Sequence, residues 1–307
     1  MELERKAVSG IMLATLLIGM LTLAFNIQPV RAEPRTWTVD DDGPADFHTI
    51  GEAVAAAGLG DTIYVRNGTY NEHIAIYSKT DLRIFGEDRN NTIIDGNGYG
   101  PVVTIAYGFN VTFAHFTVRN AGWTNWERDN GIRLYQTQLS QVTDCIVSGG
   151  AYGIREIREW GVGGKNVING NTVSDCTEVA IGSSHASSIG NIVANNTIMN
   201  NTKFGIYFNN PYNIQIIGNH VFGTESQYNH VGIHLQVGGL NNTIIGNRVE
   251  YSHYGIRLDY ADSNVVEENA LENCSDEALV GIESSNNIIA GNNASGSSYG
   301  FALRDQS

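Results

Sequence analysis

The sequence has few cysteines, few prolines and few positive charges. There are 3 Cys and 5 Pro in 307 residues, and 18 Lys and Arg against 32 Asp and Glu give a net charge of −14. So few cysteines exclude a small scaffold held by disulfides, and the acidic balance argues against a nucleic-acid partner, because such proteins need a basic face for phosphate groups. With 42% hydrophobic and 16% charged residues, the composition is that of a folded chain rather than a disordered one.

The chain also lacks a hydrophobic run long enough to cross a membrane. Its main apolar stretch, residues 11–25, is shorter than the roughly 18 to 20 residues that a spanning helix needs. The stretch follows two basic residues and precedes Val30-Arg31-Ala32, which is typical of a signal peptidase site. We therefore expect a secretory signal peptide over residues 1–32 and a mature protein that is secreted or held at the cell surface, with no membrane span. An uncleaved membrane anchor is the alternative.

What the sequence has in excess is Gly and Asn, neither of which favours helix interiors. From Asn130 onward, a Gly or Ala followed by an apolar residue recurs every 22 to 27 residues. These anchors are Gly131-Ile132, Gly153-Ile154, Ala180-Ile181, Gly205-Ile206, Gly232-Ile233, Gly255-Ile256, Ala278-Leu279 and Gly300-Phe301. A second column runs in phase with them and consists of Asn171, Asn196, Asn219, Asn247 and Asn269. Two columns in phase indicate a repeat architecture.

Each repeat contains short runs of alternating apolar residues separated by Asn and Gly. The runs are too short for amphipathic helices, and this period with Asn and Gly turns is typical of a solenoid of strands. If the coils stack in parallel at about 4.8 Å, the Ile residues of the anchors form an apolar ladder inside, and the Asn side chains bond to those of neighbouring coils. The sequence therefore predicts an all-β, single-stranded parallel β-helix solenoid of about ten coils.

The two ends of the solenoid differ. Residues 33–61 are predicted to form an N-terminal cap, and residues 62–307 to form the β-helix repeats. Thr49-Ile-Gly-Glu52 is a capping box before a short helix, residues 50–57, that can cover the open end of the core. Nothing resembling a cap follows the anchor at Gly300, so we expect the last coil to be uncapped. Either the chain is one piece of a longer architecture, or a partner covers that edge.

These columns resemble the right-handed parallel β-helix of the pectin-lyase-like group. The closest resemblance is to NosD-type periplasmic copper-binding proteins and to carbohydrate-binding and sugar-hydrolase β-helix domains. Residues 39–50, 60–65 and 67–70 are similar to the start of secreted β-helix proteins. The resemblance implies a right-handed coil with a short N-terminal capping helix. It leaves the activity open, because many chemistries share this solenoid.

The motifs of related enzymes are only partly present. Gly68-Thr69-Tyr70-Asn71-Glu72 is similar to the Gly-x-Tyr-x-Glu of pectin methylesterases, but the other catalytic segments of that family and the Gly-His-Gly of polygalacturonases are absent. A calcium-dependent lyase or epimerase needs no fixed linear motif, so calcium remains a cofactor for that alternative. Copper is less favoured, because Met199 is the only Met beyond residue 32 and soft sulfur ligands are therefore scarce. Whether the protein is an enzyme stays open.

The outer face of the anchor strands supplies the candidate ligand-binding residues. If the Ile and Leu of Gly-Ile-x-Leu point inward, positions two before, two after and four after the Gly point outward. The candidates at these positions are Arg133, Arg155, Lys203, Tyr207, His230, His234, His253, Arg257 and Asp259. Stacking is expected to place His230 over His253 and His234 over Arg257, with Asp259 close by.

A strip of Arg, His, Tyr and Asp suits a sugar chain, whose hydroxyl groups form directed hydrogen bonds. We therefore expect the protein to bind or process polysaccharide or a cell-surface glycan. Two alternatives stay open, a non-enzymatic structural or NosD-like accessory protein and the calcium-dependent lyase or epimerase. Imidazoles could recruit a transition metal, but no metal site is predicted. Trp123, Trp126 and Trp160 are expected in loops that form the walls of a groove, where they could grip sugars or could pack on the coil beneath.

The three cysteines are expected to be free and packed. Cys176 and Cys274 hold the same place in repeats that are four coils apart, which is about 19 Å and far beyond the reach of a disulfide. Cys145 falls in a different column.

Overall fold

The computed structural model describes residues 33–123, 125, 129–159, 163–183, 188–223 and 230–304. The predicted signal peptide, Trp126 and Trp160 lie outside the described residues. Arg35–Ser307 forms one compact unit. Nearly all its regular structure is β, in three parallel sheets that we name A, B and C.

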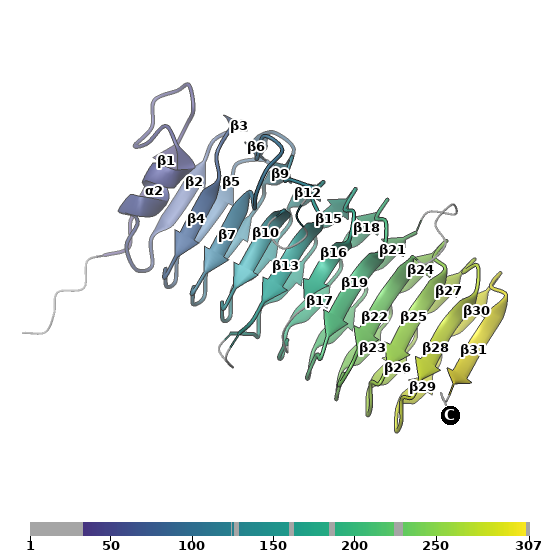
Figure 1. Ribbon diagram of the computed structural model, residues 1–307. Coiled ribbons are helices and arrows are strands. Elements are labelled where there is room, and N and C mark those ends of the chain that lie inside the picture. The colour runs from purple at the N-terminus through teal and green to yellow at the C-terminus, as the bar shows by residue number, and fades with distance from the viewer. Residues whose placement is uncertain are drawn as a thin grey trace, which may run out of the picture. The chain divides into compact units, whose positions relative to one another are not determined.

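The strands of each sheet follow one another along the solenoid in chain order (Figure 1). Sheet A contains β1 (Thr36–Val39), β2 (Thr62–Val65), β5 (Arg83–Gly86), β8 (Thr112–Ala114), β11 (Gln141–Thr143), β14 (Val167–Asn169), β17 (Ile192–Ala194), β20 (Gln215–Ile217), β23 (Thr243–Ile245), β26 (Val265–Glu267) and β29 (Ile288–Ala290). Sheet B contains β3 (Gly68–Tyr70), β6 (Thr92–Asp95), β9 (Thr117–Arg119), β12 (Ile146–Ser148), β15 (Thr172–Ser174), β18 (Thr197–Met199), β21 (His220–Phe222), β24 (Arg248–Glu250), β27 (Ala270–Glu272) and β30 (Asn293–Ser295). Sheet C contains β4 (Ile74–Tyr77), β7 (Val103–Ala106), β10 (Asn130–Tyr135), β13 (Tyr152–Ile157), β16 (Val179–Ser183), β19 (Phe204–Asn209), β22 (Val231–Gln236), β25 (Tyr254–Asp259), β28 (Glu277–Ile282) and β31 (Tyr299–Arg304).

One strand from each sheet makes one coil, so strands β2 to β31 of the described chain make ten coils. The anchor residues pair in register on sheet C, from Ile132 with Ile154 through Ile233 with Ile256 to Leu279 with Phe301. From Ile132 to Leu279 these ladder side chains are fully buried. The predicted all-β parallel solenoid of about ten coils is confirmed.

The predicted Asn column forms a continuous ladder at the bend between sheets A and B. Asn219 is typical of it: its Nδ2 donates to Asn247 Oδ1 at 3.0 Å and to Val193 O at 2.8 Å, and its N donates to Asn247 Oδ1 at 2.9 Å. Each amide therefore satisfies backbone groups that a sharp, buried bend would leave unpaired. Exposed residues just before the ladder, such as Asn195 with φ 54°, adopt the left-handed conformation that Asn tolerates and the bend requires.

A second Asn ladder, which the sequence analysis did not identify, occupies the bend between sheets C and A. Its members are Asn166, Asn191, Asn242, Asn264 and Asn287. Ile214 interrupts this ladder, and the Nδ2 of the neighbouring Asn191 donates instead to the carboxylate of Glu156. The sequence signal for this second ladder is an Asn five residues before each Asn of the first column, as in Asn242 and Asn247.

The N-terminal end of the core is covered by α2 (Ile50–Ala56), whose Ile50, Ala53 and Val54 are buried. Thr49 caps this helix by accepting from Glu52 N at 3.3 Å. Glu72 adds a cap from a distant segment, because its two carboxylate oxygens accept from the N of Ile50 and of Gly51, each at 2.9 Å. β1, which was not predicted, pairs with β2 and adds a strand to sheet A at this end.

In the motif similar to pectin methylesterases, Gly68, Tyr70 and Glu72 each contact a neighbouring part of the N-terminal segment. Gly68 lies so close to Asp41 that a Cβ would be 2.2 Å from Asp41 Oδ1. Tyr70 is buried and donates from its hydroxyl to Arg66 O at 3.0 Å, and Glu72 caps α2. These residues therefore stabilise the N-terminal coil.

At the other end, β31 lies at the edge of sheet C, and inward positions of its coil are open. Phe301, which belongs to the buried anchor ladder, is 54% exposed. The sole helix among the described residues is α2, and no described helix has the length and apolar character to cross a membrane. Cys145, Cys176 and Cys274 are free and buried, as predicted.

Candidate functional site

Six residues of sheet C form a straight column on its outer face, which we call the central column. Its members in register are Arg133, Arg155, Gly182, Tyr207, His234 and Arg257. Parallel strands hold successive members about 4.8 Å apart. Two residues further along each strand, Asn209, Gln236 and Asp259 form a second outward column. These are the positions two and four after the anchor Gly.

The residues two before the anchor Gly do not share this face, which differs from the sequence-based expectation. A Cβ on Gly153 would lie 2.3 Å from Val173 Cγ1, so the Gly faces the core together with the Ile that follows it. This breaks the strict alternation of the strand. The outward position is instead the residue directly before the Gly, which is Tyr152, Phe204 or Tyr254 in three of the coils.

Lys203, His230 and His253 therefore lie at the bend between sheets B and C. His230 is fully buried, with its Nδ1 3.1 Å from the Oγ of Ser252. His253 is its neighbour in the next coil, and the backbone N of His253 donates to His230 O at 2.9 Å. The ammonium of Lys203 is bonded to Glu178 at 2.6 Å. Among the described residues, none of these three side chains makes a ring contact or a polar contact with the central column.

His234, Arg257 and Asp259 form a buried polar unit at one end of the central column. His234 Nε2 lies 3.0 Å from Asp259 Oδ2, and Arg257 Nε donates to both carboxylate oxygens of Asp259 at 2.9 Å. Burial by itself raises the pKa of Asp259, but hydrogen bonds from His234 and Arg257 hold that pKa below its ordinary value. Burial lowers the pKa of His234, so the imidazole is neutral at neutral pH.

The neutral imidazole has one defined tautomer. An ionised carboxylate only accepts, so the hydrogen resides on Nε2 and Nδ1 carries a lone pair. Nδ1 is buried and has no hydrogen-bond partner among the described residues. A buried polar atom without a partner is uncommon and destabilising, by about 1–3 kcal/mol. His234 thus presents a hydrogen-bond acceptor that a donor would stabilise.

Aromatic rings surround this end of the column. The rings of Phe204 and Tyr207 have centroids 5.5 and 5.4 Å from that of His234 and 4.8 Å from each other. The hydroxyl of Tyr207 donates to Gln236 Oε1. Arg257 lies over the ring of Tyr254 at 5.2 Å. The recurrence of an aromatic residue before Gly, as in Tyr254-Gly255, is the sequence signal that would have identified these rings.

The other end of the column carries adjacent guanidinium groups. Arg133 pairs in register with Arg155, and the next residue on the far side is Thr104, so no carboxylate lies beside Arg133 in the column. The Cζ of Arg133 lies 5.9 Å from the ring centroid of Tyr135, and its buried Nε has no hydrogen-bond partner among the described residues.

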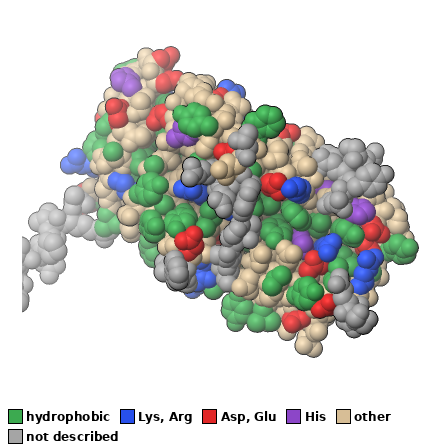
Figure 2. All heavy atoms as spheres, in the orientation of Figure 1, with side chains coloured by type: hydrophobic (Ala, Val, Ile, Leu, Met, Phe, Trp, Pro, Cys, Tyr) green, Lys and Arg blue, Asp and Glu red, His purple; other side chains and the backbone are tan. Residues whose placement is uncertain are grey.

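On the face of the molecule in Figure 2, positive, acidic and His side chains lie among hydrophobic ones.

Beneath the central column, Glu156 points into the coil, where the preceding coil has Leu134. It is 3% exposed and accepts from Ser188 Oγ at 2.6 Å, from Asn166 Nδ2 at 3.0 Å and from Asn191 Nδ2. Burial, partly offset by these three donors, raises its pKa. Glu156 thus joins the core to the second Asn ladder.

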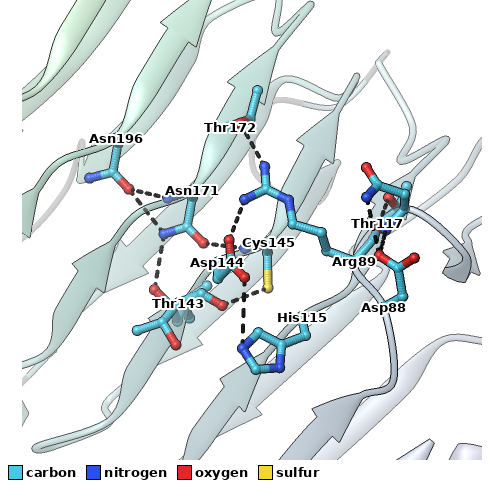
Figure 3. A network of polar contacts seen from close by, with 12 residues as sticks. Asp88, Arg89, His115, Thr117, Thr143, Asp144, Cys145, Asn171, Thr172 and Asn196 are labelled. Carbon is cyan, nitrogen blue, oxygen red and sulfur yellow. Dashed lines mark hydrogen bonds and ion pairs between the residues drawn. The ribbon is translucent and has the colours of Figure 1, made fainter. Parts of the chain in front are cut away.

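A second polar network lies at the bend between sheets A and B (Figure 3). Arg89 reaches across from an earlier coil to Asp144, and also donates to Thr172 Oγ1 at 2.8 Å. His115 Nε2 lies 3.7 Å from the other carboxylate oxygen of Asp144. Because Arg89, Asp144, His115 and Thr172 come from different coils, this network ties coils together.

The metal-binding capacity of the described residues is limited. The one group of three His, Cys, Asp or Glu whose ligand atoms lie within 4.8 Å of one another is Asp40, Asp41 and Asp42, in the described part of the cap. Asp41 and Asp42 are exposed, and Asp40 and Asp41 accept from the backbone N of Gly43 and of Thr69. Oxygen ligands suit calcium rather than copper. His230, His234 and His253 do not form such a group.

Two family models match the chain. One is described as periplasmic copper-binding protein (NosD) and matches residues 55–247, and the other, right handed beta helix region, matches residues 190–307. No curated protein matches the chain.

Solved structures share the fold at low sequence identity. An alginate lyase from Paenibacillus sp. str. FPU-7 is 13% identical over 88% of this chain and 98% of that chain, with a TM-score of 0.64. A GH136 lacto-N-biosidase from Eubacterium ramulus is 10% identical over 88% of this chain and 68% of that one, with a TM-score of 0.61. XylC, in a complex with xylose, is 11% identical over 82% and 69%, with a TM-score of 0.52. At these identities, the likeness establishes the fold alone.

Proposed function

Because the chain belongs to the periplasmic copper-binding protein (NosD) family and forms a right-handed β-helix, we propose that it is an extracytoplasmic protein that binds polysaccharide along the outer face of sheet C. The binding surface is the central column with the aromatic residues that flank it. The proposal concerns binding first, and a reaction on the bound glycan would require additional groups.

The observation that carries the proposal is the composition of the central column. A chain with a net charge of −14 places two arginines, a tyrosine, a histidine and a third arginine in one line of sheet C. The line runs across consecutive strands, so a linear polymer lying along it passes a different residue of the column at each coil. The column and its flanking aromatic rings offer hydrogen-bond donors, acceptors and flat apolar surfaces. A sugar that carries hydroxyl and acidic groups can use all three.

Copper binding, which the family description names, does not fit the described residues. Copper prefers imidazole and sulfur ligands, whereas the three described cysteines are buried at separate positions and no cluster of described His and Cys ligand atoms exists. We therefore assign no copper to this chain. Calcium is likewise unassigned, because carboxylate oxygens of Asp40 and Asp41 in the cap accept hydrogen bonds from backbone N–H groups.

The proposal is tested by affinity electrophoresis of the full chain in gels that contain alginate, polygalacturonate, hyaluronan or a neutral xylan. We expect retardation in at least one acidic gel and no change on adding a chelator. Absorbance of unsaturated sugars in the ultraviolet, abolished by chelator, would instead identify the calcium-dependent lyase. Absence of retardation in every gel would leave the structural or accessory role and contradict the proposal.

A further inference from the structure

The N-terminal end of sheet C carries three tyrosines on neighbouring strands, and we infer that they hold the glycan by stacking on its rings while Arg133 binds an acidic group. The tyrosines are Tyr77 on β4, Tyr107 directly after β7 and Tyr135 on β10 (Figure 1). We call them the tyrosine platform. This inference rests on the proposed function and makes it specific in place and in ligand class.

The tyrosine platform is accessible to a ligand, whereas much of the central column is not. Tyr77 and Tyr107 are each 52% exposed, and Tyr135 is half-buried on the outer side of β10. Arg155 and His234 of the central column are only 3% and 5% exposed. An aromatic ring with one face open to solvent offers flat apolar surface to a ligand. A sugar chain on sheet C therefore meets aromatic surface at the N-terminal end of the sheet.

Tyr107 occupies a position that its backbone does not favour. Its φ is 54°, a left-handed conformation that Gly and Asn adopt at less cost than a residue with a bulky side chain. Its ring packs against that of Tyr135, with centroids 5.4 Å apart and planes at 83°. The hydroxyl of Tyr135 donates to Glu159 Oε2 at 2.8 Å, which holds the second ring in place. The two rings thus form an aromatic corner that is organised before a ligand arrives.

Arg133 supplies the group that recognises an acid. Its contact is with the ring of Tyr135, and it forms no ion pair with a described residue. Of its three side-chain nitrogens only Nε is buried, so the two terminal nitrogens are left to a ligand. A carboxylate or a sulfate accepts from such a pair in a bidentate, charge-assisted contact. The neighbouring Arg155 is buried over the ring of Tyr152, so the site offers one positive group.

The spacing of the tyrosine platform fits a chain of sugar rings. Tyr77 and Tyr135 both pair in register with Ala106, from opposite sides, so they share one outward column two coils apart, about 9.6 Å. An extended disaccharide has a similar length, so alternate rings of one chain can lie over the two tyrosines. Arg133 precedes Tyr135 by two residues on the same strand, about 7 Å away. The ligand is therefore an extended acidic glycan rather than a small anion.

The test measures the affinity of the full chain for four probes by isothermal titration calorimetry. Hexagalacturonate carries carboxylates and a carrageenan hexasaccharide carries sulfates. Fully methyl-esterified hexagalacturonate has the rings without the charge, and hexaglutamate has the charge without the rings. We expect one of the two acidic hexasaccharides to bind at least tenfold more tightly than the methyl ester and than hexaglutamate. Whichever binds more tightly identifies carboxylate or sulfate as the group at Arg133.

Tyr107→Asn and Tyr260→Asn are a matched pair of variants. Tyr260 is 46% exposed, has φ 51° and directly follows β25, so it is the equivalent of Tyr107 in a distant coil. Asn tolerates this backbone, so both variants should unfold at the urea concentration of the unmodified chain. We expect Tyr107→Asn to weaken binding of the tighter hexasaccharide at least fivefold and Tyr260→Asn to leave it within twofold. Tyr107→Phe keeps the ring and should bind as the unmodified chain does.

The outcomes separate this inference from the proposed function. Equal weakening by the two Asn variants, no effect of Tyr107→Asn, or equal affinity for the methyl ester or hexaglutamate would overturn the inference while the proposed function stood. Retardation of the chain in polysaccharide gels without binding of either acidic hexasaccharide would do the same. Failure of both hexasaccharides and of every gel would count against the proposed function as well.

Discussion

His234 on β22 and Asp259 on β25 are joined across adjacent coils by a 3.0 Å contact between Nε2 and Oδ2. Neither residue contributes to the apolar core, yet both are at most 6% exposed. A polar contact of this kind, with Arg257 bonded to the same carboxylate, fixes the tautomer of the imidazole and the side-chain conformation of three residues on the outer face. This end of the outer face of sheet C is thus preorganised.

Replacing Asn219 by Ala should destabilise the solenoid strongly. The change removes the acceptor of Asn196 N and of Asn196 Nδ2, both of which are buried. Unsatisfied buried groups of this kind should lower the free energy of unfolding by about 3 kcal/mol, measured by urea unfolding. Asn195→Gly, one residue before the ladder at an exposed position of positive φ, is the matched control and should change it by less than about 1 kcal/mol. Similar losses for both variants would mean that the ladder is not what stabilises the bend.

Glu156 should make stability depend on pH in a defined direction. Burial raises its pKa in the folded state, so its stabilising contribution is fully present below its ordinary pKa of 4.5 and is lost as pH rises through the folded pKa. Glu156→Gln should abolish this component, seen as a smaller fall in the free energy of unfolding between acidic and neutral pH. A pH profile of Glu156→Gln that matches that of the unmodified chain would refute the assignment.

Loss of Glu72 should loosen the N-terminal cap. Its carboxylate satisfies the N–H groups of Ile50 and Gly51 at the start of α2. Glu72→Ala should cost about 1 kcal/mol and speed amide hydrogen exchange in α2 more than in the central strands. Glu72→Gln, which keeps one acceptor oxygen, should show a smaller effect. Unaltered exchange in α2 would show that Thr49 alone is a sufficient cap.

The three thiols should be unreactive in the folded protein. Burial raises the pKa of Cys145 to about 12 and that of Cys274 to about 11, and it raises the pKa of Cys176 as well. The thiolate is the reactive form, so Ellman's reagent should label no thiol under native conditions and all three after denaturation. Rapid native labelling, or a disulfide-linked dimer on a non-reducing gel, would contradict the buried placement.

Much of the fold follows from the sequence because a solenoid repeats its physical requirements at each coil. Each coil needs an Ile at an inward position and an Asn at a bend, so both columns are visible in the sequence. The pairing of His234 with Arg257 follows from the same register. The second Asn ladder was detectable too, but Ile214 interrupts it and conceals its period.

The candidate site was less predictable because it depends on one break in strand alternation. The Gly or Ala of each anchor faces inward together with the apolar residue that follows it, and at Gly153 a Cβ would lie 2.3 Å from Val173 Cγ1. That shift moves Lys203, His230 and His253 to a bend and brings Tyr152, Phe204 and Tyr254 to the face. No property of a single repeat reveals such a shift. The contact of Glu72 with α2 joins segments that share no repeat position, so it too lies beyond sequence periodicity.

The central claim is that polysaccharide binds to sheet C, and one arginine on each sheet tests it most directly. The measurement is the dissociation constant of the acidic polysaccharide that retards the unmodified chain, for Arg133→Ala on sheet C, Arg83→Ala on sheet A and Arg248→Ala on sheet B. All three variants remove the same charge, so general electrostatics affects them equally. We predict that Arg133→Ala weakens binding at least tenfold and that the other two leave it within twofold. Equal weakening by all three, or loss through Arg83 or Arg248 alone, would contradict the account.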